Sequence, residues 1–534
     1  MTRRLVLSRY VLAVLALCVL AAAALSIVAA ALLAPSGRPP ELTAARHSSL
    51  LIVIDGLRAD YVTPELMPNL YALGESGVFG ERHSSAFPSV TRVNSASIST
   101  GSYPARHGLM HNTMFVAEMS DEAFSTGSAR NLRRFAKFAG GRLLTAPTLG
   151  ELLHARGLRL FVTGSGGSGN SLLQNPFAGG DSGMEIWTPG LFVPESAREK
   201  ALRAVGELPP DDAGRTVWAF DAYLREAASA APADAVILWI HEVDGAGHRY
   251  GVGAPETLDA IAHVDDQIGR LVATLERTGL ADRVNIFVTA DHGFSTDTGS
   301  FNVARTLRGA GLGANDLTVV ANMIFMRRDD PAVLARAVEA LQRDPAVGNV
   351  YTRAARPGSD EGVVPGSLST SVIQWDHERA ADVIVTPTWS DGVNEHGFRG
   401  TSSRGGRPGH GSDSPYELRI PLVASGPDIK SGVRSRVPTG NVDFAPTILH
   451  LLGVEPPEGM SGRVLEELLR GGPAPGDVTV RERTHEAAVR FEDGFRYRAA
   501  LDTLEVDGTV YLRGARTIRE RPRSPRKTSP ARGF

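Results

Sequence analysis

Residues 50–56 read Leu-Leu-Ile-Val-Ile-Asp-Gly, an uninterrupted apolar run that ends in an acid and a glycine. A short run without a polar position fits a strand that is buried on both faces, as in a parallel sheet. The pattern recurs at four further places, where an apolar run is again followed by small or polar residues. These runs are 158–162, 235–240, 284–288 and 420–424.

Helical patterns lie between the apolar runs. Residues 148–155 and 255–277 carry apolar side chains at helical spacing. Strands that alternate with helices predict an α/β fold, with a mostly parallel central sheet flanked by helices. In such folds ligands bind at the carboxyl ends of the strands, where Asp55, Asp244 and the pair Asp291-His292 fall.

The N-terminus carries a targeting signal. Residues 1–9 contain three arginines, and the run at 10–34 has no charged residue. A spanning helix needs ~20 apolar residues, whereas a signal-peptide core has about 7–15. We therefore expect a single-pass anchor in the cell membrane, with residues 1–9 cytoplasmic and the rest extracytoplasmic. The alternative is a signal peptide and a secreted protein.

The remaining boundaries follow from composition and pattern. We expect a linker at 35–48, a catalytic domain at 49–470 with an inserted cap at about 295–405, a strand-rich extension at 471–516 and a basic, disordered tail at 517–534. Within the insertion, the sequence predicts a strand at 317–326 and a helix at 331–343.

The overall charge is nearly balanced. Lys plus Arg number 56 against 59 Asp plus Glu, which argues against a partner that is a nucleic-acid polymer. A small anionic substrate remains compatible with this balance, and the composition leaves the oligomeric state open.

Six acids and imidazoles form the candidate metal-binding set. They are Asp55, Asp244, His248, Asp291, His292 and His410. Carboxylate and imidazole ligands together suit zinc or a similar divalent ion, and six side chains suffice for two sites of three ligands each. Any one of them alone would be a weak signal, but four of the six follow predicted buried strands.

A candidate nucleophile lies in residues 87–94, Phe-Pro-Ser-Val-Thr-Arg-Val-Asn. A hydroxyl needs activation to attack phosphorus, and metal coordination can supply it. Ser89, Thr91, Ser95 and Ser97 all qualify as residue types, so this reasoning does not choose among them.

From about residue 50 to 454 the sequence resembles the type I phosphodiesterase/nucleotide pyrophosphatase family of the alkaline phosphatase superfamily. Six segments carry the resemblance, in the family's order: LLIVIDGLRADY, FPSVTRVNSASISTGSYPARHGLMHN, HEVDGAGHRYG, VTADHG, GHGSD and NVDFAPTILHLLGV. The resemblance implies an alkaline-phosphatase-like core and a metal-dependent phosphoester hydrolase.

The resemblance also implies roles for individual residues. Thr91 matches the family's nucleophile and would form a phosphothreonine intermediate, and Asn112 matches the donor to a phosphate oxygen. Two divalent ions, Zn²⁺ being expected, would be held by two sets of ligands. One set is Asp55, Asp291 and His292, with Thr91 bridging, and the other is Asp244, His248 and His410.

The sequence departs from the family beside Thr91. Nucleotide-hydrolysing members carry Lys-Thr-Phe, whose ring stacks on the base, but here the triplet is Val90-Thr91-Arg92. Arg92 could stack through its guanidinium or bind an anionic group of the substrate. Monoesterases of the superfamily also place Lys and Arg after the strand that follows the nucleophile, and residues 160–197 contain neither. The resemblance therefore favours a diesterase.

Four alternative functions remain. A phosphomonoesterase or a phosphonoacetate-hydrolase-like enzyme would share the threonine chemistry. A sulfatase would need a Cys-x-Pro-x-Arg type motif, but the only cysteine is Cys18 and Ser89 is not followed by proline. A non-catalytic binding domain would be expected to have lost ligands, and all six are present.

Overall fold

The computed structural model describes residues 46–406 and 408–521. The predicted segments 1–9 and 10–34, nearly all of the linker and residues 522–534 lie outside this part of the chain. Within the described chain, residues 47–406 and 408–521 belong to one compact unit. Among the described helices, none combines the length and the apolar character that crossing a bilayer requires.

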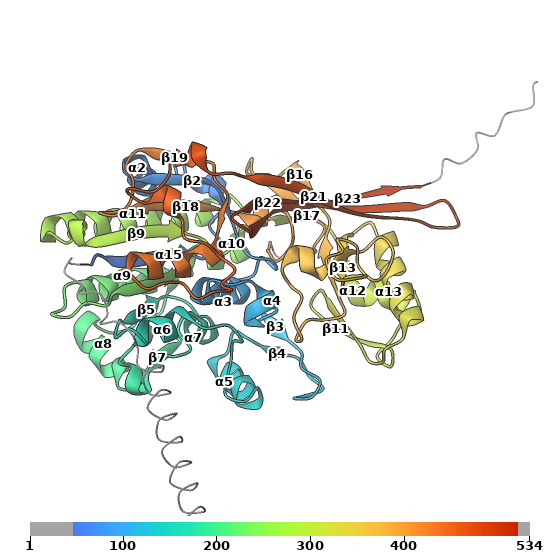
Figure 1. Cartoon of the computed structure of the whole chain (residues 1–534), viewed down its shortest axis with the longest axis horizontal. Helices are drawn as coiled ribbons and strands as arrows, with labels where there is room; N and C mark the ends of the chain where they lie inside the picture. Colours follow the sequence, from blue (N-terminus) through green and yellow to red (C-terminus); the bar gives the residue numbers. More distant parts are fainter. Residues whose placement is uncertain (1–45, 407, 522–534) are drawn as a thin grey trace, which may run out of the picture. The chain divides into compact units, whose positions relative to one another are not determined.

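A ten-stranded sheet forms the centre of the fold, in the order β19-β2-β18-β9-β1-β8-β5-β6-β7, with β20 beside β2 (Figure 1). Its middle strands β9, β1, β8 and β5 are all parallel, as the sequence predicts. The strands are β1 (Ser48–Ile54), β2 (Val78–Ser84), β5 (Leu160–Gly164), β6 (Ile186–Thr188), β7 (Leu191–Val193), β8 (Ala235–Ile240), β9 (Val284–Thr289), β18 (Arg419–Ser425), β19 (Val433–Ser435) and β20 (Thr439–Gly440).

The strand predicted at 420–424 forms, as β18, but it runs antiparallel to both β9 and β2. The chain passes through the loop of His410 at the carboxyl edge of the sheet, then through the short helix α14 (Pro415–Leu418), and enters β18 directly. A strand that starts at this edge has to run against the strands that end there. The sheet is therefore mixed, with a parallel centre.

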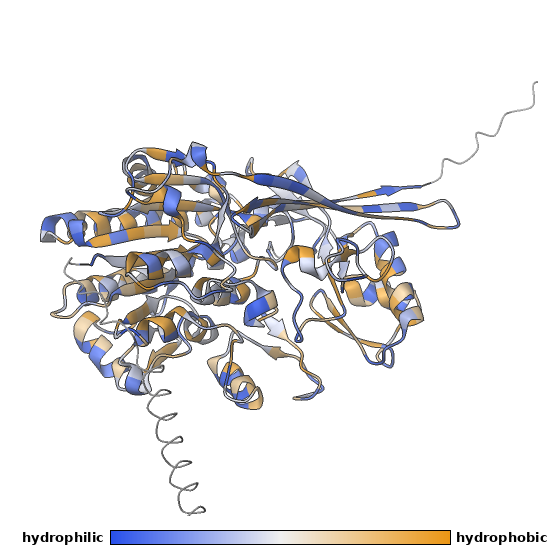
Figure 2. Cartoon of the chain, viewed as in Figure 1, coloured by the Kyte–Doolittle hydropathy of each residue, from blue (hydrophilic) through white to orange (hydrophobic). Residues whose placement is uncertain are grey.

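Helices cover both faces of the sheet. Alternate residues of β1 face two different cores, with Leu50 and Ile52 in one and Leu51 and Val53 in the other, so the run is apolar at every position. Figure 2 shows the resulting concentration of apolar residues along the central strands. The first core includes α2 (Pro68–Ser76), α8 (Ala197–Val205), α9 (Asp212–Ala227) and α11 (Pro255–Thr278), and the second includes α3 (Thr91–Thr100), α6 (Leu149–His154) and α15 (Phe444–Leu451).

The insertion between β9 and β18 has a sheet of its own, in the order β11-β12-β15-β13-β14, and the predicted helix appears as α13 (Pro331–Arg343). The single strand predicted at 317–326 is wrong. The chain forms an antiparallel hairpin of β11 (Leu317–Val320) and β12 (Met323–Met326), and it turns at Ala321, whose φ is 54°. An apolar run shows that a segment is buried but does not show where it reverses. The other strands are β13 (Val347–Thr352), β14 (Leu368–Ser369) and β15 (Val383–Pro387).

The C-terminal extension is a three-stranded antiparallel sheet of β21 (Arg481–Arg490), β22 (Arg496–Val506) and β23 (Thr509–Glu520). The prediction of disorder from residue 517 is wrong for residues 517–520, which belong to β23. They are fixed by contacts with the insertion, because Thr517 Oγ1 donates a hydrogen bond to Asn349 Oδ1 and Arg519 Nε donates to the carbonyl of Gln342.

Candidate active site

The structure brings the seven predicted metal-site residues together at the carboxyl edge of the central sheet. Asp55 follows β1 and the pair Asp291-His292 follows β9. Asp244 and His248 lie one turn apart on α10 (Glu242–Tyr250), directly after β8. The remaining two come from the helix and loop that border this edge: Thr91 is the first residue of α3, and His410 lies in the loop before α14.

One set of ligand atoms surrounds His292 Nε2. Asp291 Oδ2 lies 3.2 Å from this nitrogen and Asp55 Oδ1 lies 3.5 Å from it. Thr91 Oγ1 lies 3.2 Å from the same nitrogen. The three predicted ligands and the hydroxyl of Thr91 therefore converge on one point.

The second set is equally compact. Asp244 Oδ1 lies 3.4 Å from His248 Nε2 and 3.6 Å from His410 Nε2, and the two imidazole nitrogens are 3.2 Å apart. In each set of three the ligand atoms lie within 4.8 Å of one another. These are the two groups that the sequence resemblance implies.

The converging atoms are bare hydrogen-bond acceptors. Asp55 Oδ1, Asp244 Oδ1 and Asp291 Oδ2 are buried and accept no hydrogen bond within the described chain. Each of the three imidazoles has its Nδ1 next to a backbone carbonyl, at 3.0 Å for His292, 2.8 Å for His248 and 2.9 Å for His410. A carbonyl can only accept, so Nδ1 carries the proton and Nε2 presents a lone pair.

The electrostatics of the site also fit a cation. Burial and the neighbouring Asp55 raise the pKa of Asp244 to about 6 and the pKa of Asp291 well above its usual value. Burial lowers the pKa of His292 to about 4 and that of His410 well below its usual value, so both imidazoles are neutral at pH 7. Three carboxylates thus face one another, and the imidazole of His241, whose pKa is raised to about 9, contacts only Asp55 and Asp244 among them. Divalent ions would balance the remaining negative charge. The donor set suits zinc.

The structure separates the four hydroxyls that the sequence left as alternatives. Ser89 Oγ donates to the carbonyl of Ser412 at 2.7 Å, and Ser95 Oγ donates to the carbonyl of Asn170 at 3.3 Å. Ser97 Oγ contacts His107 Nε2 at 3.1 Å, away from the metal-ligand sets. Of the four, only Thr91 contacts a candidate ligand. Its position at the N-terminus of α3 also favours negative charge on its oxygen.

Asn112 and Arg92 lie beside Thr91. Asn112 Oδ1 accepts a hydrogen bond from Arg92 N at 3.0 Å, which fixes the amide group, and no described residue accepts from its Nδ2. The guanidinium of Arg92 lies beside Gly127, where an added Cβ would come within 3.4 Å of its Nη2, and its buried Nε has no partner among the described residues. No described carboxylate forms an ion pair with Arg92, so the site contains a positive charge that is available to an anion.

One residue that sequence reasoning missed is His241, which lies between β8 and α10. Its Nδ1 is 3.7 Å from Asp55 Oδ2 and 3.6 Å from Asp244 Oδ2, so it contacts one carboxylate from each set. Asp55 Oδ2 also accepts a hydrogen bond from Trp239 Nε1 at 2.9 Å. Its position in the sequence could have marked His241 as a site residue, because it directly follows an apolar run, as Asp55 does.

Two buried polar residues hold the loops that carry the ligands. Glu417, which is fully buried, accepts hydrogen bonds from Ser412 N at 2.7 Å and from Arg404 Nη2 at 2.6 Å, and it fixes the loop of His410. Asn94 accepts from Ala86 N at 2.8 Å and stabilises the turn before Thr91.

Comparison with known proteins agrees with this geometry. The sequence model described as type I phosphodiesterase/nucleotide pyrophosphatase matches residues 49–392. The chain belongs to this family. It is therefore a phosphoric ester hydrolase of a metal-dependent family, and the structure contains candidate metal-ligand sets.

Curated relatives and solved structures extend the comparison. This chain is 24% identical over 415 residues to the mouse bis(5'-adenosyl)-triphosphatase enpp4, covering 76% of this chain and 78% of that protein. It is 27% identical over 272 residues to human ectonucleotide pyrophosphatase/phosphodiesterase family member 7, covering 50% of this chain and 52% of that protein.

Solved structures confirm the alkaline-phosphatase-like fold. A mutant of the alkaline phosphatase PafA superposes with a TM-score of 0.62 at 16% identity, over 80% of this chain and 100% of that one. Murine ectonucleotide pyrophosphatase/phosphodiesterase 5 superposes with a TM-score of 0.54 at 18% identity, over 79% of this chain and 100% of that one.

Proposed function

We propose that this protein is an extracytoplasmic two-metal enzyme that cleaves small phosphodiesters or pyrophosphates and uses Thr91 as its nucleophile. The observation that carries the proposal is the convergence of the Thr91 hydroxyl with two sets of bare ligand atoms. Asp55, Asp291 and His292 would hold one zinc ion, and Asp244, His248 and His410 the other. Bound zinc would supply Lewis-acid stabilisation of the negative charges that develop during displacement at phosphorus.

The residues of the chain would carry out the other steps of the reaction. Thr91 Oγ1 gives up its proton to solvent and attacks phosphorus, a bond forms between this oxygen and phosphorus, and the bond to the leaving group breaks. The departing oxygen takes up a proton from solvent. Water then hydrolyses the phosphothreonine and restores the hydroxyl. Asn112, held through its Oδ1, would donate from Nδ2 to a non-bridging oxygen and stabilise the charge on it.

The loop after β5 supports a preference for diesters. Ser165 in this loop accepts a hydrogen bond from His241 N at 2.9 Å, so the loop lies beside the metal-ligand residues. Residues 165–170 read Ser-Gly-Gly-Ser-Gly-Asn and contain no cation. A monoester carries one more charged oxygen than a diester, and a missing charged hydrogen bond costs about 1.5–3 kcal/mol, or roughly one to two decades in rate.

Arg92 would influence which class of substrate the enzyme accepts. The mouse relative is named for a substrate with two adenosyl groups, whereas here an arginine stands at the place of the stacking aromatic residue. We propose that Arg92 binds an anionic group attached to the reacting phosphorus. The same cation could serve a monoester, which makes a phosphomonoesterase the second candidate.

A comparison of kcat/KM for an aryl phosphate and its methyl diester tests the proposal. We expect the diester to be preferred by tenfold or more, with no turnover of either substrate by Thr91→Ala. A tenfold preference for the monoester that collapses in Arg92→Ala would instead establish the second candidate. Turnover of neither ester by the zinc-loaded enzyme would reject both.

A further inference from the structure

Helix α5 (Ala129–Phe138) presents a continuous row of cations to solvent. Arg130, Arg133, Arg134 and Lys137 are all exposed, and their spacing of three and four residues places them on one face. Within the described chain none of the four forms an ion pair or a side-chain hydrogen bond, and residues 128–142 contain no acid. The exposed Arg142 follows at the end of the same segment.

The opposite face fixes the helix to the protein. Leu132 and Phe135 are buried in the core shared with the insertion, and the guanidinium of Arg379 lies 4.8 Å from the ring centre of Phe135. Ser128 caps the first turn by accepting a hydrogen bond from Asn131 N at 3.4 Å. The cationic face is therefore held outward by a rigid helix.

This row of charges opposes the stability of the free protein. Like charges three or four residues apart on a helix are destabilising, and the row contains four such pairs. Three exposed arginines of the C-terminal sheet are paired, by contrast: Arg481 pairs with Glu505 at 3.2 Å, Arg516 pairs with Asp502, and Arg498 pairs with Glu486. An anionic partner would relieve the repulsion on α5.

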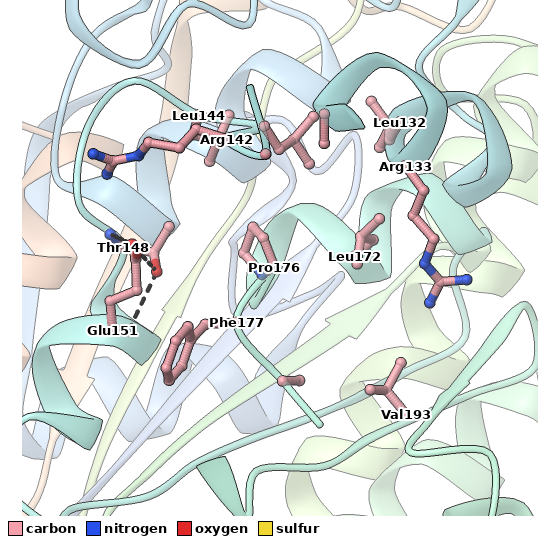
Figure 3. A pocket seen from close by; sticks show the side chains of 14 residues that line it. Leu132, Arg133, Arg142, Leu144, Thr148, Glu151, Leu172, Pro176, Phe177 and Val193 are labelled. Atoms are coloured by element: carbon pink, nitrogen blue, oxygen red, sulfur yellow. Dashed lines mark hydrogen bonds between the residues drawn. The ribbon is translucent and has the colours of Figure 1, made fainter. Parts of the chain in front are cut away.

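Apolar features border the row. Phe138 ends the helix with 49% of its surface exposed, and Phe177 is 38% exposed. Phe177 lines a pocket of about 250 Å³ whose lining also includes the apolar side chains of Leu132, Leu172 and Pro176. Figure 3 shows Arg133 and Arg142 on opposite sides of this pocket. The one acid in its lining, Glu151, accepts hydrogen bonds from Thr148 N and Oγ1 at 2.7 and 2.9 Å.

We propose that this face, formed by α5, Arg142 and Phe177, docks onto the surface of a membrane that contains anionic lipids. Lipid headgroups would neutralise the cations, and the two exposed aromatic rings would enter the interfacial layer, as aromatic side chains do at membrane surfaces. A soluble polyanion would satisfy the charges but would leave the rings and the apolar pocket exposed to water. The surface shares no residue with the metal-ligand sets or with the apolar run at 10–34.

The chain of residues 46–534 is the suitable protein for the test, because the run at 10–34 would itself bind lipid. All described elements lie from Ser48 onward in one compact unit, so this chain keeps every described contact. Binding is measured by flotation with phosphatidylcholine vesicles that contain or lack phosphatidylglycerol. We expect binding only with phosphatidylglycerol, and a loss of that binding at high salt.

The triple variant Arg133→Gln, Arg134→Gln, Lys137→Gln should weaken binding by roughly fivefold for each cation removed, without lowering the melting temperature. The matched control, Arg481→Gln, Arg498→Gln, Arg516→Gln, removes three paired cations and should bind like the unmodified chain. Phe138→Ser should also weaken binding while it leaves the charge unchanged.

Equal binding to both kinds of vesicle, or no binding to either, would overturn the proposal. An equal loss in the control variant would show that only net charge matters, and would also overturn it. Heparin binding that is lost in the triple variant, with vesicle binding unaffected, would point instead to a soluble polyanion.

Discussion

Replacement of Asp291 by asparagine should have opposite effects on stability in the presence and absence of zinc. Asp291 is fully buried, and its Oδ1 accepts hydrogen bonds from Gly56 N at 3.0 Å and from His292 N at 2.9 Å. Its Oδ2, the candidate ligand atom, has no hydrogen-bond partner in the described chain. The substituted asparagine would keep both bonds through its own Oδ1, while an amide would replace the ligand oxygen.

The size of the effect follows from the spacing of the carboxylates. The ligand oxygens of Asp291 and Asp55 lie within 4.8 Å of each other, at which distance two unit charges repel by about 3.5 kcal/mol at an effective dielectric constant of ~20. Burial and the neighbouring charge of Asp55 raise the pKa of Asp291 well above its usual value, in the direction that this repulsion requires. At about pH 8 in a chelator, Asp291→Asn should stabilise the fold by about 1–3 kcal/mol.

Zinc should reverse the order of stability, so that the unmodified enzyme becomes more stable than Asp291→Asn. A ligand that binds only the folded state stabilises it by about 4 kcal/mol at a free concentration a thousand times its Kd. Asp291→Asn loses an anionic ligand from one set, so it should gain much less from zinc than the unmodified enzyme. Thermal melts of both proteins, each with chelator and with zinc, measure the two effects.

Asp265→Asn is the matched control. Asp265 is also buried, but its Oδ2 accepts hydrogen bonds from Asn69 N and Nδ2 at 2.9 and 2.8 Å, and its Oδ1 accepts from Leu70 N at 2.8 Å. This variant should lose about 1–3 kcal/mol in both conditions. Two outcomes would refute this prediction. In chelator, Asp291→Asn could prove as destabilising as Asp265→Asn. In zinc, Asp291→Asn could be stabilised as much as the unmodified enzyme is.

Three further outcomes are expected. Thr91→Ala should retain bound zinc by elemental analysis but lose turnover, and Thr91→Ser should keep part of it; near-normal rates for Thr91→Ala alongside an inactive Ser89→Ala would identify the wrong hydroxyl. His241→Ala should weaken zinc binding by about 10–100-fold in a chelator competition, because the imidazole orients one carboxylate of each set, and an unchanged affinity would argue against that contact. The stabilisation by zinc should shrink as pH falls from 7 to 5. In the metal-free fold Asp244 has a pKa of about 6, so below it the folded state holds a proton that zinc must displace; a melting-temperature shift that is independent of pH would contradict this.

Sequence patterns predicted the centre of the fold because the signal there is local. β1, β8 and β9 are apolar at nearly every position, and each is buried on both faces of the sheet. The helix predicted at 255–277 appears as α11, since its apolar spacing matches the face that it buries. Residues that follow such strands in the sequence are gathered at one edge, which is why the candidate ligands could be chosen before any distance was known.

Where the sequence failed, the missing information was long-range. The apolar run of β18 showed burial, but its direction depends on the edge at which the chain enters the sheet. The run at 317–326 did not show its reversal at Ala321. Residues 517–520 looked like part of a charged tail, and only their contacts with Asn349 and Gln342 make them a strand.

By itself, then, the sequence determined the buried strands, the family and the six ligands of the candidate metal sites, because composition and short motifs encode burial and chemistry. The tertiary structure decided which hydroxyl faces the ligands, since Thr91 and His292 are 201 residues apart and meet only in the fold. It also revealed the contact of His241 with both carboxylates and the unpaired cations of α5. Those properties depend on distances between side chains and on which charges lack partners. A local stretch of sequence determines neither the distances nor the pairing of charges.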